Sequence, residues 1–534
     1  MLTIKPDFAE AYYNLGNTLQ TQGRLAEAEA GYGRALRIKP DYAEAHNNLG
    51  VTLQEQGRLA EAEAGYRRAL ENRPDYAEAH NNLGVTLQEQ RRLTEAEASY
   101  ERALAIKPDY AEACSNLLFT LNFTNSHPPR HCLKVARHYG DLAAKKAGTV
   151  FSSWQCEARP GCLRVGLVSG DLRNHPVGYF LEDMLAHIDS ARIELIAYPT
   201  RRGEDDLTAR LKPHFVAWKP LMGQSDEAAA RLIHADGIHL LLDLSGHTHD
   251  SRLPLFAWKP APVQAGWLGY FATTGVAEMD YLLADKVGVP EKNQGHFSEK
   301  VRYLPDTRLC FSAPKYDIPV ASLPALKNGY VTFGCFQNLR KVTDAVLEAW
   351  GSIMAQLPMA RLRLQSKQLR DKEFVRLFHS HLADFGIDAD RVSMHGAGAR
   401  EDYLAAYAQV DLILDTFPYP GGATTCEALW MGVPVLTLAG DTLLARQGAG
   451  LLSAAGLRDW IADDRERYVE KAVMFASDLK GLAKRRAALR RQVMKSPLFD
   501  ARRFARNFEK VLWEMWCDYR KSPQPSLPRS KGVS

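Results

Sequence analysis

Small, apolar and aromatic residues recur every 34 residues through the first part of the chain. Proline marks one position in each unit, at Pro6, Pro40, Pro74 and Pro108. The small residues let two antiparallel helices approach closely, and the proline ends the second helix of each pair. The pattern therefore predicts an α-solenoid of helix pairs over residues 1–122.

The spacing inside each unit is that of tetratricopeptide repeats. Three full units begin near Ala9, Ala43 and Ala77, and a fourth, partial unit begins at Ala111 but has Leu118 where the glycine belongs. Residues 1–7 match the end of a repeat. We therefore expect the array to be truncated at its N-terminus, with further repeats upstream in the natural protein.

Asparagine recurs in register on the first helix of each unit, at Asn14, Asn48, Asn82 and Asn116. These positions are expected to face the concave groove, where a ladder of carboxamides can bind an extended peptide backbone through donor and acceptor atoms. The alternative is that they are solvated polar positions duplicated with the repeat. We expect the groove to bind a protein or peptide acceptor.

Short buried apolar runs alternate with helical patterns in the rest of the chain, which is typical of α/β domains with parallel sheets. The sequence thus predicts a solenoid followed by two Rossmann-like domains (fold class α + α/β). The predicted segments are a helical connector (123–160), a first Rossmann-like domain (161–312), a linker (313–327), a second Rossmann-like domain (328–500), a terminal helix (501–521) and a disordered tail (522–534).

Composition narrows the function classes. Sixty-seven basic residues against sixty-three acidic ones leave no bulk charge field of the kind that marks nucleic-acid-binding proteins. The densest basic run, residues 484–506, is interpreted as a solvated helix face. The eight cysteines form no metal-binding spacing and fit a reducing compartment, and no apolar run of ~18 residues is present. We expect a cytoplasmic protein with no nucleic-acid or membrane partner.

The stretch from Asp411 to Leu452 is the centre of the predicted chemistry. It combines a buried strand, a loop ending in Gly421-Gly422, a helix from about Ala423 and a second strand. In parallel sheets such a turn feeds a helix N-terminus, where backbone N–H groups favour an anion. The glycines would admit a phosphate, with hydroxyl donors from Thr424 and Thr425. Glu427 could accept hydrogen bonds from a ribose diol. An ordinary turn with threonine N-caps fits the same spacing.

Two further strand ends in the same domain carry candidate ligand-binding residues. Arg340 and Lys341 are expected near a helix N-terminus, where cations are disfavoured unless an anion is close. The segment from Met394 to Tyr403 has small residues, including Gly398, that could receive a flat base, with Tyr403 as a stacking surface. The alternative for the cations is an unimportant surface pair.

The first α/β domain offers two candidate general bases, His175 and His247, each after a predicted strand. With sixteen histidines in the chain, either could instead be structural. No metal motif and no GxxxxGK loop accompany the phosphate features. We therefore expect no metal and no other cofactor, and a diphosphate leaving group stabilised by Lys341 and the helix dipole.

Four motifs together resemble the O-linked N-acetylglucosamine transferases, which glycosylate serine and threonine of cytosolic proteins. The resemblance covers most of the chain and implies two facing domains of the GT-B arrangement and inverting, metal-independent transfer from UDP-N-acetylglucosamine. The motifs are Asp171–Pro176, Pro260–Tyr270, Phe336–Lys341 and the stretch from Asp411 to Leu452.

The resemblance also implies roles for single residues. His175 would be the base, Lys341 and Thr424 would contact the diphosphate, and Glu427 would contact the ribose. Three positions depart from the family pattern: Asn338 matches a glutamine that contacts the nucleotide phosphate, Tyr403 matches a histidine beside the uracil, and Arg400 matches a lysine near the base.

A fourth departure is Ala423, which replaces a threonine of the animal enzymes. Asp415–Pro420 and Thr424–Glu427 are closer to the SPINDLY branch, whose plant members use GDP-fucose. The sequence therefore predicts a protein O-glycosyltransferase with UDP-N-acetylglucosamine as donor and leaves three rivals: a protein O-fucosyltransferase, a sugar-nucleotide epimerase and an inactive repeat scaffold. A homodimer through the repeats is also open.

Overall fold

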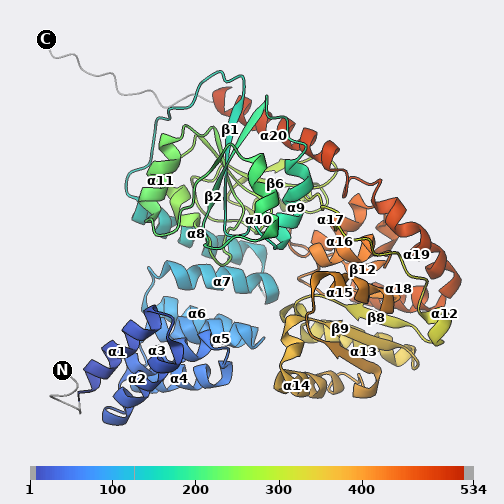
Figure 1. Ribbon diagram of the computed structural model, residues 1–534, viewed down its shortest axis with the longest axis horizontal. Coiled ribbons are helices and arrows are strands. Elements are labelled where there is room, and N and C mark those ends of the chain that lie inside the picture. The colour runs from blue at the N-terminus through green and yellow to red at the C-terminus, as the bar shows by residue number, and fades with distance from the viewer. Residues whose placement is uncertain (1–7, 125–126, 522–534) are drawn as a thin grey trace. The chain divides into compact units, whose positions relative to one another are not determined.

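The computed structural model describes residues 8–124 and 127–521 (Figure 1). The chain divides between Leu142 and Ala143 into two compact units, one helical and one built on two sheets. Both the predicted repeat end at residues 1–7 and the predicted disordered tail at residues 522–534 lie outside the described residues.

The first unit consists of antiparallel helix pairs, coloured blue in Figure 1. Within each of the first three pairs, a glycine of the first helix lies against a fully buried tyrosine of the second: a Cβ on Gly16 would come within 2.6 Å of the Tyr32 ring. Close approach therefore requires glycine. The helices are α1 (Ala9–Thr21), α2 (Leu25–Ile38), α3 (Ala43–Glu55), α4 (Leu59–Asn72), α5 (Ala77–Glu89), α6 (Leu93–Ile106), α7 (Ala111–Thr124) and α8 (Pro129–Ala147).

The fourth repeat is continued by α8. The Cys114 thiol of α7 donates to the Val135 carbonyl of α8 at 3.5 Å, and Cys132 and Val135 pack against the buried Leu117 and Leu121. Helix α8 therefore covers α7 much as the second helix of a repeat covers the first.

The second unit begins with a parallel seven-stranded sheet of order β3-β2-β1-β4-β5-β6-β7. The strands are β1 (Leu163–Ser169), β2 (Ile193–Pro199), β3 (Ala217–Trp218), β4 (Leu240–Asp243), β5 (Val263–Gly266), β6 (Tyr281–Ala284) and β7 (Lys300–Tyr303). Its longer helices are α9 (Pro176–Leu185), α10 (Asp206–Leu211) and α11 (Asp226–Ala235). Strand β3 was not predicted, because two residues carry no period.

A parallel six-stranded sheet follows, of order β10-β9-β8-β11-β12-β13. The strands are β8 (Thr332–Cys335), β9 (Arg361–Gln365), β10 (Val392–His395), β11 (Leu412–Leu414), β12 (Val435–Leu438) and β13 (Ile461–Ala462). The helices are α12 (Ala325–Asn328), α13 (Asp344–Gln356), α14 (Lys372–Ala383), α15 (Arg400–Ala405), α16 (Ala423–Trp430), α17 (Gln447–Ala454), α18 (Arg465–Ser477), α19 (Leu479–Val493) and α20 (Ala501–Lys521). The predicted fold class is confirmed.

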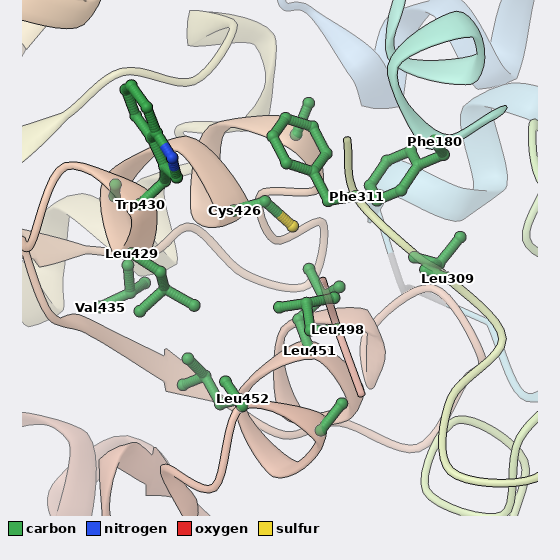
Figure 2. Packing of buried hydrophobic residues seen from close by; sticks show 14 of the residues in the cluster. Phe180, Leu309, Phe311, Cys426, Leu429, Trp430, Val435, Leu451, Leu452 and Leu498 are labelled. Atoms are coloured by element: carbon green, nitrogen blue, oxygen red, sulfur yellow. The ribbon is translucent and has the colours of Figure 1, made fainter. Parts of the chain in front are cut away.

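One hydrophobic core joins the two sheet domains. Figure 2 shows Phe180 of α9 and Phe311 near Cys426 of α16, and the two rings have centroids 5.3 Å apart in an edge-on arrangement. Helix α20 returns from the second domain to the first and lies beside α9 and β5 (Figure 1). The two sheet domains are therefore held together by shared packing.

The predicted solvated face over residues 484–506 is wrong at two arginines. Arg486, 1% exposed, donates to the carbonyls of Ala321, Val410 and Tyr407. Arg490 donates to the carbonyl of Ile318 at 2.7 Å. These guanidinium groups satisfy buried backbone acceptors, which charge counting along the sequence does not detect. No helix in the described part of the chain is long and apolar enough to cross a membrane.

Candidate functional site

The glycine turn after β11 is organised by the buried carboxylate of Asp415. Its Oδ1 accepts from Gly421 N–H at 2.7 Å and from Gln337 Nε2 at 2.7 Å, and its Oδ2 accepts from Thr437 Oγ1 at 2.8 Å. The Gly421 carbonyl in turn accepts from Gln447 Nε2 at 3.2 Å. Burial raises the pKa of Asp415, while these donors favour its ionised form. The backbone of the turn is therefore held in one conformation.

Helix α16 starts from this turn, with Gly422 as its N-cap. The alternative that Thr424 and Thr425 are N-caps is wrong, because both lie inside the first helical turn. A Cβ on Gly421 would lie 2.7 Å from Thr424 Oγ1 and closer still to Thr425 Oγ1. Thr425 Oγ1 is buried and has no hydrogen-bond partner among the residues described. Two hydroxyls and the first N–H groups of α16 thus surround a space that only glycine leaves open.

Lys341, at the end of the short helix η4 (Leu339–Lys341), reaches this turn. Its ammonium donates to the Pro420 carbonyl at 3.0 Å and lies 3.8 Å from the centroid of the Tyr419 ring. Within the described ranges, no carboxylate forms a salt bridge with it. Burial lowers the pKa of Lys341 to about 8, and the charge of Asp415 opposes that shift. The site holds a cation whose own surroundings do not neutralise it.

Glu427, Arg400 and Tyr403 form a cluster one turn further along α16. The Glu427 carboxylate accepts from Arg400 Nη2 at 2.5 Å and from Tyr403 Oη at 3.1 Å. Tyr403 meets the Phe336 ring edge-on, with centroids 5.7 Å apart. The structure brings the three predicted residues together, with the Glu427 carboxylate bound to both the guanidinium and the phenol.

Asn338 and Gly398 lie nearer the surface. Asn338 is exposed, and its Oδ1 accepts from Arg340 N–H at 3.0 Å and Gln368 Nε2 at 2.7 Å. Gly398 is exposed in the loop before α15, and a Cβ there would meet nothing closer than Asp402 at 3.6 Å. Gly398 therefore leaves open space beside Arg400.

His175 caps α9 in the first sheet domain. Its Nδ1 lies 3.4 Å from Val177 N–H and 3.5 Å from Asp171 Oδ2, and 37% of its side chain is exposed. Burial lowers the pKa of His175, Asp171 opposes this shift, and the charges of Arg173, Arg201 and Lys367 add to it. The ring is thus neutral near pH 7, next to a carboxylate that can orient it.

His247 has different surroundings. It is 4% exposed, its Nε2 lies 2.9 Å from the Thr274 carbonyl, and its ring packs edge-on against Tyr270. Burial lowers the pKa of His247 to about 4. Because Nε2–H donates to a backbone carbonyl in the core, this histidine has the features of a structural residue.

The two sheet domains meet around this site. The guanidinium of Arg400 lies 4.7 Å from the centroid of the Tyr179 ring on α9, and Phe271 meets Tyr419 edge-on. His175 is four residues before Tyr179 on the same helix. Helix α9, which His175 caps, therefore contacts the second domain at the residues of the candidate site, whereas His247 is buried in the first domain.

Sequence reasoning missed the groups that hold the turn. Asp415, Gln337, Thr437 and Gln447 are buried polar residues that contact one another or the turn backbone. The available signal was Asp415 itself, since a carboxylate at the end of an otherwise apolar strand needs buried donors. Which donors supply them depends on strands distant in sequence.

In the helical unit, the predicted asparagines form bonds between repeats. Asn48 Nδ2 donates to Tyr13 Oη at 3.1 Å and to Asn17 Oδ1 at 2.8 Å. Asn82 and Asn116 donate at 3.0 Å to Asn47 and Asn81, which correspond to Tyr13 in the repeat. Asn14, in the first repeat, is exposed. Asn82 and Asn116 each use one N–H in these bonds and retain the other for a ligand, whereas Asn48 uses both.

Family models match nearly the whole chain. The model "Glycosyl transferase family 41" matches residues 132–312 and 318–508, and a tetratricopeptide repeat model matches residues 7–75 and 41–109. The chain is 36% identical, over 77% of its length and 45% of the relative's, to a probable UDP-N-acetylglucosamine–peptide N-acetylglucosaminyltransferase SPINDLY of Solanum lycopersicum. The chain thus spans about half the length of the curated relatives it matches.

Two further relatives agree. A UDP-N-acetylglucosamine–peptide N-acetylglucosaminyltransferase of Caenorhabditis elegans is 26% identical over 67% of this chain and 41% of its own. A solved structure of an O-GlcNAc transferase variant from Thermobaculum terrenum is 34% identical, covers 96% of this chain and 98% of its own, and superposes with a TM-score of 0.86. Together with the repeats, the two parallel sheets and the glycine turn of the second, these matches show that the chain belongs to glycosyltransferase family 41.

Proposed function

We propose that this chain is a protein O-glycosyltransferase that transfers N-acetylglucosamine from UDP-N-acetylglucosamine to serine or threonine of proteins, with inversion and without a metal. The observation that carries the proposal is the ammonium of Lys341, which lies beside a glycine turn and a helix N-terminus and, among the described residues, has only the Pro420 carbonyl as its hydrogen-bond partner. A diphosphate supplies the missing negative charge.

The donor binds along the second sheet. Gly421 and Gly422 leave room for the diphosphate, which accepts from the N–H groups of Gly422 and the start of α16, from the hydroxyls of Thr424 and Thr425, and from Lys341. Asn338 contacts the phosphates from the opposite side. Glu427 receives the ribose hydroxyls, while Tyr403 and Arg400, next to the space above Gly398, contact the base. Binding at Glu427 exchanges its present bonds to Arg400 and Tyr403 for bonds to the ribose.

Transfer needs a base on the other side of the cleft. His175 Nε2 takes the proton of the acceptor hydroxyl as its oxygen attacks the anomeric carbon. The bond from that carbon to the phosphate oxygen breaks, and its electron pair leaves with UDP, where Lys341 stabilises the charge. In this step Nδ1 carries the ring hydrogen and donates it to Asp171, 3.5 Å away, in place of accepting from Val177 N–H, so that Nε2 is unprotonated. The buried position of His247 favours His175 for this role.

The acceptor is a protein segment bound in the groove of the repeats. The carboxamides of Asn14, Asn48, Asn82 and Asn116 contact its backbone, which carries no information about side chains and so admits many acceptors. A cytoplasmic location fits the eight cysteines, all of which are free thiols. A homodimer through the repeats remains a prediction.

GDP-fucose is the competing donor. The departures at Asn338, Arg400 and Tyr403 all lie where the base and phosphates bind, and the 36% identity to the SPINDLY relative exceeds the 26% identity to the nematode enzyme. Because base and sugar are read by these few side chains, the competing reaction requires no change of fold.

Calorimetry and mass spectrometry test the proposal together. UDP should bind equally well with and without a chelator, and more tightly than GDP. Incubation with UDP-N-acetylglucosamine should add N-acetylhexosamine to an acceptor protein, and a Lys341→Ala variant should add far less. Loss of UDP binding with chelator would contradict the metal-free assignment. Addition of deoxyhexose from GDP-fucose instead would make the chain a fucosyltransferase.

A further inference from the structure

A second polar pocket lies on the second sheet domain, away from the glycine turn. It has a volume of about 560 Å³ and is formed by the edge strand β10, its neighbour β9, the segment from Ala321 to Thr332 and the end of η7 (Ala406–Gln409). None of its lining residues belongs to the predicted donor or acceptor sites. The pocket therefore needs its own explanation.

The lining of this pocket is strongly basic. Four cationic side chains contribute to it, against the single carboxylate of Asp390. The Arg361 guanidinium lies 4.6 Å from the centroid of the Tyr330 ring, which holds the charge at the pocket wall. The cations are Lys327, Arg361, Arg363 and Arg391.

Arg363 is the unusual member of this group, because it is only 7% exposed. Its Nη1 donates to His395 Nε2 at 2.7 Å and Gln409 Oε1 at 2.8 Å, and its Nη2 donates to Gln365 Oε1 at 3.1 Å. All three partners are uncharged, since a histidine that accepts a hydrogen bond is neutral. The Nε–H group has no acceptor within residues 8–124 and 127–521.

A buried guanidinium without a counterion is costly, and proteins normally pair such a charge with a carboxylate. Here the strand period brings it to the pocket: Leu362 and Leu364 face the core, so Arg361, Arg363 and Gln365 lie on the opposite face of β9. Three guanidinium donors are used, which leaves two of five for a ligand.

We propose that this pocket is a binding site for a small phosphoryl anion, such as a phosphate ester, whose charge Arg363 and Arg361 neutralise. A phosphoryl group fits better than a monocarboxylate because its second negative charge and third oxygen match the excess of cations. The site is separate from the donor site, so it binds its ligand whether or not the proposed transferase activity is correct.

Inorganic phosphate is the probe, titrated by calorimetry at fixed ionic strength. All proteins carry Lys341→Ala, so that phosphate at the glycine turn does not contribute. Into this background we introduce Arg363→Gln, Arg361→Gln and, as a matched control, Arg376→Gln. Arg376 is an exposed arginine of α14 paired with Glu373 and loses the same charge outside the pocket. Citrate is titrated in parallel.

The background protein and the Arg376→Gln control should bind phosphate equally. Arg363→Gln should weaken binding at least about 10-fold and Arg361→Gln about threefold or more, as expected for charge-assisted hydrogen bonds. If circular dichroism shows Arg363→Gln to be unfolded, the exposed Arg361→Gln decides the question. No phosphate binding in the background, or Arg361→Gln indistinguishable from the control, would overturn the site. Tighter binding of citrate than of phosphate through the same arginines would overturn the phosphoryl assignment.

Discussion

The segment after β1 of the first sheet, which carries His175, and the glycine turn after β11 of the second sheet are built differently. At the end of β11, the carboxylate of Asp415 accepts four hydrogen bonds. The donors belong to Gln337, Thr416, Gly421 and Thr437, and all four residues are buried. After β1, His175 is partly exposed, and its Nδ1 has two alternative partners, Val177 N at 3.4 Å and Asp171 Oδ2 at 3.5 Å. The glycine turn after β11 is fixed by buried hydrogen bonds, whereas the His175 ring after β1 can change its partner.

This difference matches the two tasks proposed for them. A leaving diphosphate is stabilised best by donors that need no reorganisation, which a buried network provides. A base must change its protonation state in each cycle, so it needs some access to solvent and a pKa near the working pH. His247 meets neither need, because its ring is buried and bound to a carbonyl.

The largest effect on the rate of transfer is expected from the loss of His175. His175→Ala should slow single-turnover transfer by about 100- to 10,000-fold, because deprotonation of the acceptor is unassisted. UDP affinity, measured by calorimetry, should stay unchanged. His247→Ala is the comparison: it should lower the free energy of unfolding by about 1–3 kcal/mol through the lost buried hydrogen bond and leave the rate of the folded protein within a few-fold. Near-normal rates in His175→Ala would contradict the base assignment.

Beside the glycine turn, Lys341→Ala should slow transfer by about 100- to 1000-fold, since it removes charge stabilisation that grows as the leaving group departs. A donor with a better leaving group should restore part of this rate but little of the rate of His175→Ala. Lys372→Ala, which removes an exposed lysine from α14 of the same domain, is the control. A silent Lys341→Ala would favour the inactive scaffold.

The affinity for UDP should depend on pH through Lys341. Its pKa of about 8 in the free protein means that the ammonium is charged below pH 8 and neutral well above it. An anion binds the charged form, so affinity should fall about twofold between pH 7 and pH 8 and about fivefold between pH 8 and pH 9. Calorimetry over this range checks the sign, and Lys341→Ala should remove the dependence. Affinity that rises with pH would be incompatible with a diphosphate at this lysine.

The smallest effect on protein glycosylation is expected from substitutions in the repeats. Changing Asn14, Asn48, Asn82 and Asn116 to alanine should impair glycosylation of a protein acceptor several-fold, while hydrolysis of the donor by water stays near normal.

A matched control is available for this variant. Asn47→Ala with Asn81→Ala breaks two of the same bonds between repeats, from residues that are themselves buried. Equal impairment by this control, or loss of both reactions in the ladder variant, would indicate damage to the solenoid instead of lost peptide contacts.

Much of the architecture followed from local pattern. The strands Leu163–Ser169 and Val263–Gly266 each coincide with a short, mostly apolar run in the sequence, because a buried strand ends where its apolar run ends. The pairing of Gly16 with Tyr32 repeats in each unit, so the period alone indicated a helix pair. Arg486 escaped prediction because the carbonyls that it binds belong to other elements.

The sequence by itself determined the repeats, the two parallel sheets and the turn that could bind a phosphate, since periodicity, glycine and proline act over neighbouring residues. Only the tertiary structure decided which polar side chains meet. It brought Lys341 to the carbonyl of Pro420, joined Glu427 to Arg400 and buried His247 while leaving His175 partly exposed. Burial and pairing set the charge of each of these groups, and both depend on contacts between residues far apart along the chain.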